Sequence, residues 1–150
     1  MWGPAGHGYV YLIYGYHHCF NAVCQRRGIA EAVLIRAIES EFGEERMLLQ
    51  RPVQDRRDLT NGPAKLCAAL DIDLNLDGAD VCSASSAVFV ARNPRRKSFL
   101  KLRGPVVTTT RIGLSKAAEL PLRFYLENSL FVSKRAHPIA GNSRRQARDP

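Results

Sequence analysis

The chain has 150 residues, of which 45% are hydrophobic and 24% are charged, a composition that excludes wholesale disorder and fits one folded domain. Its 22 basic and 14 acidic side chains give a formal net charge of +8. This charge favours an anionic partner, with nucleic acid ahead of an acidic membrane surface. No apolar run approaches the roughly 18 residues that a membrane span needs, so we expect no membrane segment.

Standard catalytic and metal-binding motifs do not occur in the sequence. It contains no G-x-S-x-G elbow, Walker loop, G-x-G-x-x-G after a strand, or H-E-x-x-H. Cys19, Cys24, Cys67 and Cys82 form no C-x-x-C pair. We therefore expect free core thiols, no metal and no cofactor. Because no signal peptide stands at the start, the expected compartment is the reducing cytoplasm, at the nucleoid in a bacterium.

The first predicted element is a β-hairpin that begins near Tyr9. Apolar and aromatic residues run from Tyr9 to Tyr14, Gly15 offers a turn, and a second mixed run reaches Asn21. The alternation places Tyr9, Tyr11 and Ile13 on one face and Val10, Leu12 and Tyr14 on the other, with Tyr14 at the tip. The pattern alone leaves two interpretations open: an ordinary core hairpin, or an aromatic wedge that is presented to a ligand.

A second strand is predicted over Ala32–Ile38, which is apolar on both faces except for Arg36. A guanidinium in such a strand must form an ion pair or reach a ligand. A salt bridge to Glu31 or Glu39 and a binding role are equally open.

Two helices are predicted next. Glu44–Arg51 has acids in its first turn and stops before Pro52, and a second helix begins at Pro63, with Leu66 and Leu70 facing the core. Lys65 lies in the first turn of that second helix, where amide groups and a cation suit a phosphate. A merely solvated lysine is the alternative.

The rest of the chain predicts short elements and basic loops. The expected strands are Ser86–Ala91, Pro105–Thr110, Leu122–Leu126 and Leu130–Ser133, the expected helix is Ser115–Leu120, the basic loop is Arg92–Lys97, and a basic tail covers Arg135–Pro150. From the residues alone, the chain is a basic α+β domain suited to nucleic acid, with no reaction indicated.

Seven blocks, taken together and in order, resemble the alkyladenine (3-methyladenine, methylpurine) DNA glycosylase family. They are Met1–Gly15, Cys19–Asn21, Ala32–Ala37, Leu59–Cys67, Thr110–Gly113, Leu122–Tyr125 and Phe131–Ser133. The resemblance implies a single α+β domain over residues 1–134, in which a curved antiparallel sheet carries a protruding β-hairpin and short flanking helices, followed by a basic tail over 135–150. It implies a monomer whose partner is double-stranded DNA with a damaged purine.

The implied activity is base-excision repair: the enzyme flips an alkylated or deaminated purine out of the duplex and hydrolyses its N-glycosidic bond. The roles that the resemblance implies are DNA intercalation by Tyr14, contact with the flipped base by Tyr11 and Asn21, positioning of the attacking water by Arg36 and the Val132 carbonyl, and phosphate contacts by Arg51 and Lys65.

The general base of this family is a glutamate in a segment before the block that starts at Met1, and this chain begins after that segment. No glutamate here lies in a matching context, so the sequence nominates no substitute. The second hypothesis is accordingly a DNA-binding remnant of the family that does not catalyse hydrolysis.

Overall fold

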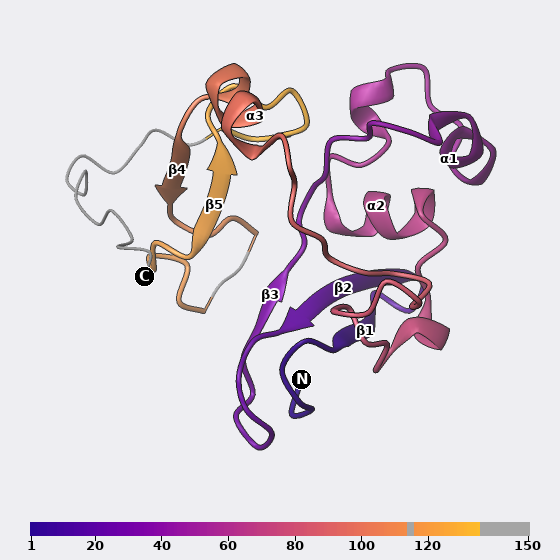
Figure 1. Ribbon diagram of the computed structural model, residues 1–150, viewed down its shortest axis with the longest axis vertical. Coiled ribbons are helices and arrows are strands. Elements are labelled where there is room, and N and C mark those ends of the chain that lie inside the picture. Colours follow the sequence, from indigo (N-terminus) through magenta and orange to yellow (C-terminus); the bar gives the residue numbers. More distant parts are fainter. Residues whose placement is uncertain (114–115, 136–150) are drawn as a thin grey trace. The chain divides into compact units, whose positions relative to one another are not determined.

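The structure, a computed structural model, describes residues 1–113 and 116–135 and divides the chain into two compact units (Figure 1). Unit 1 is Met1–Pro94 with Leu130–Ser133, and unit 2 is Arg95–Ser129 with the segment that begins at Lys134. Among the described residues there are three α-helices, one sheet of three strands and one of two. The α+β class is therefore confirmed, while a single domain over residues 1–134 stays a prediction.

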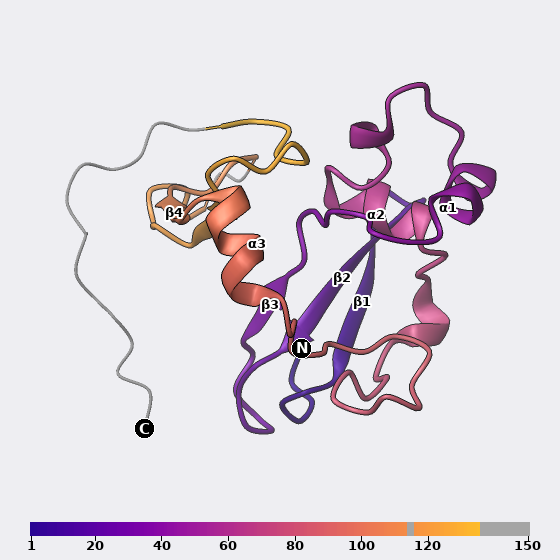
Figure 2. The same ribbon diagram turned by 45° about the horizontal axis from the view of Figure 1, so that its top comes forward.

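The hairpin forms as predicted and makes up most of the sheet of unit 1. Strand β1 (Gly8–Ile13) pairs antiparallel with β2 (His17–Val23), and the two lie side by side in Figure 2. Strand β3 (Ala32–Leu34) adds to the other edge of β2. The predicted strand over Ala32–Ile38 is wrong beyond Leu34. The Ile35 N–H still donates to Phe20 of β2, but the chain then turns away and the Ile38 N–H donates to the Thr60 carbonyl at 3.3 Å.

The core of unit 1 lies between one face of the hairpin and helix α2 (Pro63–Ala69). Val10 and Phe20 supply the strand side and Leu66 the helix side, each 4% exposed or less. Gly62 and then Pro63 at the first position start α2, as predicted. Leu70 contradicts its prediction: it is 38% exposed, because the helix ends at Ala69 and Leu70 is only its C-cap.

Helix α1 (Glu44–Gln50) confirms the other predicted helix. Its amino-terminal cap is Gly43, whose φ of 73° suits a residue without a Cβ, and Arg51 caps its carboxyl end through an N–H bond to the Met47 carbonyl at 2.8 Å. Two short 3₁₀ helices, η1 (Arg56–Asp58) and η2 (Leu74–Leu76), flank α2. No residue of α1 is buried, so this helix lies on the surface of unit 1.

The predicted strand Ser86–Ala91 is wrong. Its Val90 N–H donates to the Val81 carbonyl at 2.7 Å, but one such bond is not the row of bonds that defines a strand pair. Phe89 and Val90 are 49% and 63% exposed. β-branched and aromatic residues favour a strand here, but none of the described strands pairs with this segment.

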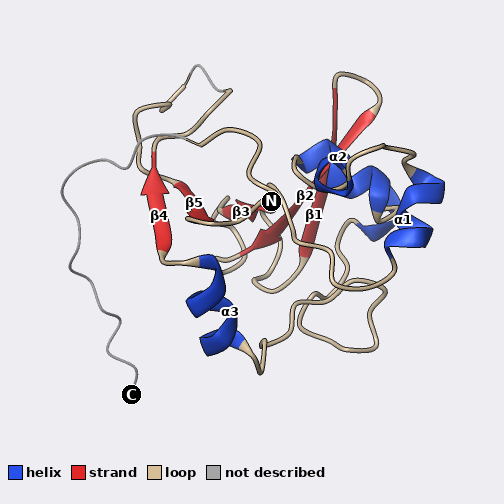
Figure 3. Cartoon of the chain, turned by 90° about the horizontal axis from the view of Figure 1, so that it is seen from above, coloured by secondary structure: helices blue, strands red, loops and turns tan. Residues whose placement is uncertain are grey.

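Unit 2 contains a helix and a two-stranded antiparallel sheet. Helix α3 (Arg96–Arg103) precedes β4 (Val106–Thr109), which pairs with β5 (Arg123–Leu126), as Figure 3 shows by element type. The strands predicted over Pro105–Thr110 and Leu122–Leu126 are confirmed. The basic loop Arg92–Lys97 is wrong at its end, since α3 begins at Arg96 and runs to the helix-ending Gly104 at φ 74°.

Two more predicted elements fail near the end of the chain. In Ser115–Leu120 the described part forms turns rather than a helix, because Ala117 has a φ of 51° that breaks helical geometry. Leu130–Ser133 forms a turn with Leu130 53% exposed. Ser115 and the tail from 136 onward lie outside the described residues. Within the described residues, every helix is too short or too polar to cross a membrane.

Candidate nucleic-acid interface

The hairpin turn holds Tyr14 in an unusual backbone conformation. Tyr14 and Gly15 have φ values of 55° and 80°, and the Tyr16 N–H donates to the Ile13 carbonyl at 3.4 Å. Positive φ at both central residues is the pattern of a type I′ turn, which favours Asn-Gly rather than a tyrosine. Tyr14 is also 79% exposed, and the turn stands clear of the helices in Figure 3. The turn therefore presents an aromatic ring to solvent at a backbone cost.

Tyr11 lies on the hairpin face that is opposite to the core residue Val10. Its ring stacks on Tyr9, with ring centroids 5.5 Å apart and planes inclined by 28°, and its direct partner across the strands is Cys19. Burial, followed by contact with the Cys19 thiol, raises the pKa of Tyr11 to about 12. The ring is therefore a neutral phenol over the physiological pH range.

Asn21 shares that face with Tyr11. It pairs with Tyr9 on one side and with Leu34 on the other, is 7% exposed, and donates from Nδ2 to the Tyr9 carbonyl at 3.1 Å. Residues two apart along a strand share a face. The structure thus brings Tyr11 and Asn21 together on one face of the hairpin, with their side chains fixed by neighbours.

All four cysteines are free, as predicted. Cys19 and Cys67 are buried, and burial is the largest cause that raises the pKa of the Cys67 thiol to about 11. Cys24 and Cys82 are exposed, so the expectation of core thiols is correct for only half of them.

Arg36 is exposed rather than buried in a strand. Its backbone is fixed on both sides, because the Ile35 N–H donates to Phe20 and Thr60 donates from Oγ1 to the Ile38 carbonyl at 2.7 Å. Within the described part of the chain Arg36 has no ion pair, so neither Glu31 nor Glu39 is its partner. The predicted place of Arg36 in a buried strand is therefore wrong, and of the two alternatives left open for its side chain the salt bridge does not form.

Val132 lies half-buried in the short segment of unit 1 that follows Leu130. No hydrogen bond among the described residues joins Arg36 to the Val132 carbonyl. The two predicted water-positioning groups therefore belong to the same unit, but the structure does not link them directly.

Lys65 is held by two polar neighbours instead of being merely solvated. Its Nζ donates to Asn61 Oδ1 at 2.7 Å and to Asp58 Oδ1 at 3.2 Å, and Asn61 Nδ2 donates to the same Asp58 oxygen at 2.8 Å. These hydrogen bonds, from Asn61 first and then Lys65, lower the pKa of the Asp58 carboxyl. An ammonium group has three donors, so one remains for a phosphate oxygen.

Arg51, the other predicted phosphate contact, caps the carboxyl end of α1 and is half-buried. Arg56 ion-pairs with Glu44 of α1 at 2.7 Å, whereas Arg51 has no ion pair within the described residues. Its guanidinium therefore keeps its donors for another ligand.

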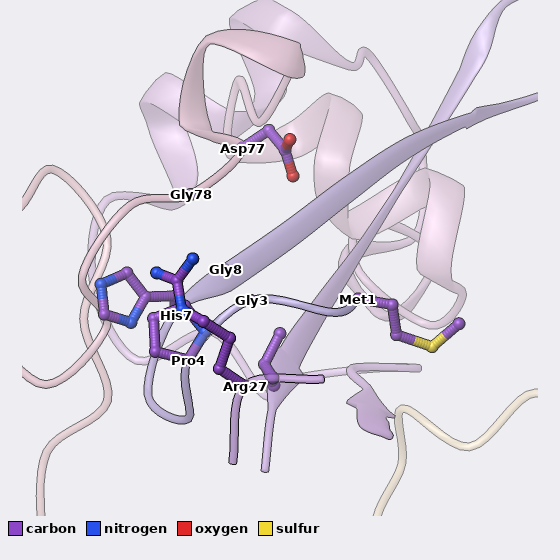
Figure 4. A pocket seen from close by; sticks show the side chains of 9 residues that line it. Met1, Gly3, Pro4, His7, Gly8, Arg27, Asp77 and Gly78 are labelled. Carbon is purple, nitrogen blue, oxygen red and sulfur yellow. The ribbon is translucent and has the colours of Figure 1, made fainter. Parts of the chain in front are cut away.

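A cavity of about 330 Å³ lies at the opposite end of β1 from the hairpin turn. Figure 4 shows His7 and Arg27 beside Pro4 on one side and Asp77 on another. None of the predicted site residues lines it. Because β1 rises about 3.3 Å per residue, the cavity is well separated from Tyr14 and forms no part of the tyrosine face. Among the described residues, no three of His, Cys, Asp or Glu cluster as metal ligands would.

Comparison with known proteins assigns the family. Residues 1–130 match the family model of methylpurine-DNA glycosylase (MPG). The chain belongs to the methylpurine-DNA glycosylase family. It is 45% identical over 135 residues to a protein of Methanoculleus marisnigri named "Putative 3-methyladenine DNA glycosylase", a match that covers 90% of this chain and 68% of that protein. Proteins of the same name from Carboxydothermus hydrogenoformans and Methanocella arvoryzae are 43% and 45% identical, over 90% and 91% of this chain and 68% and 66% of their own lengths.

Membership in the methylpurine-DNA glycosylase family connects the chain to enzymes of DNA repair that hydrolyse N-glycosyl bonds.

Sequence reasoning missed two residues that hold predicted site residues in place. Cys19 contacts Tyr11 because the hairpin register places the two residues opposite each other. The length of the turn sets this register, so predicting the turn length would have predicted the contact. Asp58 holds Lys65 from seven residues away across the loop before α2, and no local sequence pattern encodes that contact.

Proposed function

We propose that this chain binds duplex DNA containing an alkylated or deaminated purine, flips the damaged nucleotide out, and hydrolyses its N-glycosidic bond. The observation that carries the proposal is Tyr14, an exposed ring on a turn whose positive φ values suit Asn-Gly better than tyrosine. A tyrosine that is held in a disfavoured backbone conformation at an exposed tip points to a role outside the fold.

An intercalating ring solves the main energetic problem of base flipping. Extruding a nucleotide costs a few kcal/mol in lost stacking and pairing. A side chain that inserts between base steps restores part of that stacking, as wedge residues of minor-groove binders do. Tyr14 is free to make this contact because it is 79% exposed.

The face that carries Tyr11 and Asn21 supports contact with the flipped purine. Tyr11 offers a neutral ring, since its pKa is raised to about 12, and an alkylated purine that carries a positive charge gains cation–π attraction from such a ring. Asn21 is fixed by its bond to Tyr9, so its amide presents a constant pattern to the base edge. That fixed amide is the proposed source of discrimination against guanine.

Two pairs of residues complete the proposed site. Arg36 and the Val132 carbonyl would position the attacking water, and Arg51 and Lys65 would contact phosphates. Support comes from the exposed, unpaired side chain of Arg36 and from the one free donor of Lys65.

A second candidate function is DNA binding without hydrolysis. Its support is that two of the glutamates already have partners: Glu31 accepts a bond from Cys24, and Glu44 pairs with Ser40 and Arg56. A general base usually contributes about 10² to 10⁴ in rate, so its absence would suppress base release without preventing lesion binding.

Base release from a synthetic duplex decides between these two functions. The full chain is incubated in excess over duplexes that contain one hypoxanthine or one 3-methyladenine, with Tyr14→Asn as the control that lacks the ring. Release by the parent chain above the rate without protein, reduced in the control, supports the glycosylase. Tight lesion binding without release supports the second candidate, and no preference for either lesion contradicts both.

A further inference from the structure

Net positive charge is distributed very unevenly between the two units. Unit 1 contains nine basic and eleven acidic side chains, whereas the section of unit 2 from Arg95 to Ser129 contains eight basic side chains and two acidic ones. The unit that carries the predicted lesion site is therefore slightly acidic by itself. The attraction to an anionic partner that the net charge of +8 suggests must come from outside unit 1.

Helix α3 concentrates this charge in a fixed element of unit 2. Arg96, Lys97 and Lys101 are all exposed. Lys97 and Lys101 are four residues apart and so lie on the same side of the helix, with Arg96 next to Lys97 in the first turn. None of the three forms an ion pair within the described residues. We call these three side chains the α3 cationic surface.

The α3 cationic surface is held in position by the rest of unit 2. Beyond the end of the helix, the Asn128 N–H donates to the Arg103 carbonyl at 2.9 Å and the Glu127 N–H donates to Pro105 at 3.0 Å. Glu127 lies against Gly104, at the opposite end of α3 from Arg96. Glu127 therefore lies away from the first turn of α3, and the three cations have no ion-pair partner among the described residues.

Like charges at this spacing are unfavourable by themselves. A pair of cations at i and i+4 destabilises a helix by about 0.2–0.5 kcal/mol, and cations in the first turn oppose the helix macrodipole. A bound anion reverses both effects. A surface of this kind is typical of a protein that contacts a row of phosphates.

We propose that the α3 cationic surface binds the phosphodiester backbone of duplex DNA and supplies affinity that depends on neither sequence nor lesion. The inference rests on the proposed function only for its class of ligand, DNA. It assigns to unit 2 a binding role separate from lesion recognition by the hairpin of unit 1.

An acidic membrane surface is the competing anionic partner, and α3 fits it less well. Membrane-surface helices need a broad exposed apolar face opposite their cations. In α3, Leu102 is 64% exposed, whereas Phe99 and Leu100 are half-buried in unit 2. A single exposed leucine is too little apolar area for such an anchor, while phosphate contacts need none.

The test is the salt dependence of binding to a plain duplex that contains no lesion. The test variant is Arg96→Gln, Lys97→Gln, Lys101→Gln in the full chain, because glutamine keeps helix propensity. The control variant is Arg46→Gln, Arg56→Gln, Arg57→Gln, which removes three exposed cations from unit 1. Circular dichroism checks the fold, and the single variant Lys101→Gln repeats the measurement with the smallest change.

The logarithm of the association constant falls with the logarithm of salt concentration with a slope of about −0.9 per phosphate contact. We expect the test variant to lower the steepness of this slope by about 2 to 3 and to bind on the order of 10- to 100-fold more weakly near physiological salt. Lys101→Gln should lower the steepness of the slope by about 0.9. The control triple variant should lower the steepness by much less than the test variant does.

An unchanged slope in the test variant, or an equal loss in the control, would overturn the proposal. So would binding to phosphatidylserine vesicles that the test variant loses while it keeps its binding to the duplex. Because the duplex has no lesion, this result is independent of base release. If the parent chain released no base but the α3 variant still changed the salt slope, only the proposed function would be contradicted.

Discussion

The hairpin of unit 1 and helix α3 of unit 2 both expose side chains suited to DNA, but through different physical chemistry. The hairpin presents the exposed ring of Tyr14 on a strained turn and carries a face on which Tyr11 and Asn21 are fixed by neighbours. Helix α3 presents unpaired cations and half-buries its larger apolar residues. Stacking and shape act at short range and can distinguish a damaged base, whereas charge acts over about a Debye length and cannot.

Net positive charge and specificity for a damaged base can therefore lie in separate parts of one chain. Unit 1 is slightly acidic in total, and its cations Arg56, Arg57 and Lys65 are ion-paired. The slight net negative charge of unit 1 weakens its attraction to undamaged DNA, so binding at the proposed lesion site depends more on the base. Changes in one unit should therefore alter one property of binding and leave the other intact.

The largest expected effect is on the stability of unit 1. Leu66→Ala removes a side chain that is 1% exposed and packs against Val10 and Phe20, so the free energy of unfolding should fall by about 2–5 kcal/mol. Chemical denaturation followed by circular dichroism measures the change. The control is Leu102→Ala on α3, where the leucine is 64% exposed and a loss of comparable size would show that the assigned core is wrong.

Tyr14→Asn tests whether the ring at the hairpin turn contributes to DNA binding. Asparagine tolerates positive φ in this turn, so the variant should fold at least as stably as the parent while it lacks the intercalating ring. Loss of one stacked contact is worth about 1–3 kcal/mol, which predicts roughly 5- to 150-fold weaker binding to an abasic-site duplex and a smaller loss on plain duplex.

Tyr16→Ala is the matched control for Tyr14→Asn, because Tyr16 is 71% exposed in the same turn. Its ring lies against His17, with ring centroids 4.2 Å apart, and is not assigned to the DNA gap. An equal loss of abasic-site binding in both variants would contradict a specific role for Tyr14.

Parts of this comparison follow from the sequence and parts do not. The alternating run from Tyr9 placed the hairpin, and Pro63 after Gly62 placed α2, because turn residues and period act locally. The sequence misplaces Arg36 because an apolar run predicts a strand, whereas the chain turns away from β2 after Ile35 and the Ile38 N–H donates to Thr60 instead. The failure over Ser86–Ala91 has a different cause, because none of the described strands pairs with that segment.

The α3 cationic surface was also outside the reach of local sequence rules. In the sequence its residues continue a basic loop, and what makes them one surface is helix α3, which sets Lys97 and Lys101 on the same side. The roles of Tyr14, Tyr11 and Asn21 came from resemblance, and the structure contributes their exposure, their register and their hydrogen bonds.

A smaller effect is expected at Lys65. Asp58→Asn removes the carboxylate that binds the Lys65 ammonium at 3.2 Å and would repel a phosphate. Affinity for plain duplex should rise a few-fold, the scale of an exposed ion pair, with little change in the preference for a damaged duplex. Fluorescence anisotropy on both duplexes measures this, and weaker binding would show that Asp58 helps Lys65 to contact phosphate instead.

The last effect concerns the stability of the folded chain at alkaline pH. Because the pKa of Tyr11 is raised from 10.0 to about 12 in the folded chain, the folded state keeps its phenolic proton at a pH where the unfolded state loses it. The free energy of unfolding should therefore decline between about pH 10 and about pH 12. Tyr11→Phe should show a shallower decline over this range, and identical pH profiles for parent and variant would contradict the partly buried environment of Tyr11.

The most direct test of the account is a crossed measurement of affinity for a plain duplex and for the same duplex with one abasic site. It compares the parent chain, Tyr14→Asn, and the triple variant of the α3 cationic surface. The account predicts that Tyr14→Asn lowers the ratio of abasic-site to plain affinity, while the triple variant weakens both affinities by the same factor and leaves the ratio unchanged. A ratio that falls in the triple variant, or that survives in Tyr14→Asn, would contradict the division of binding between the two units.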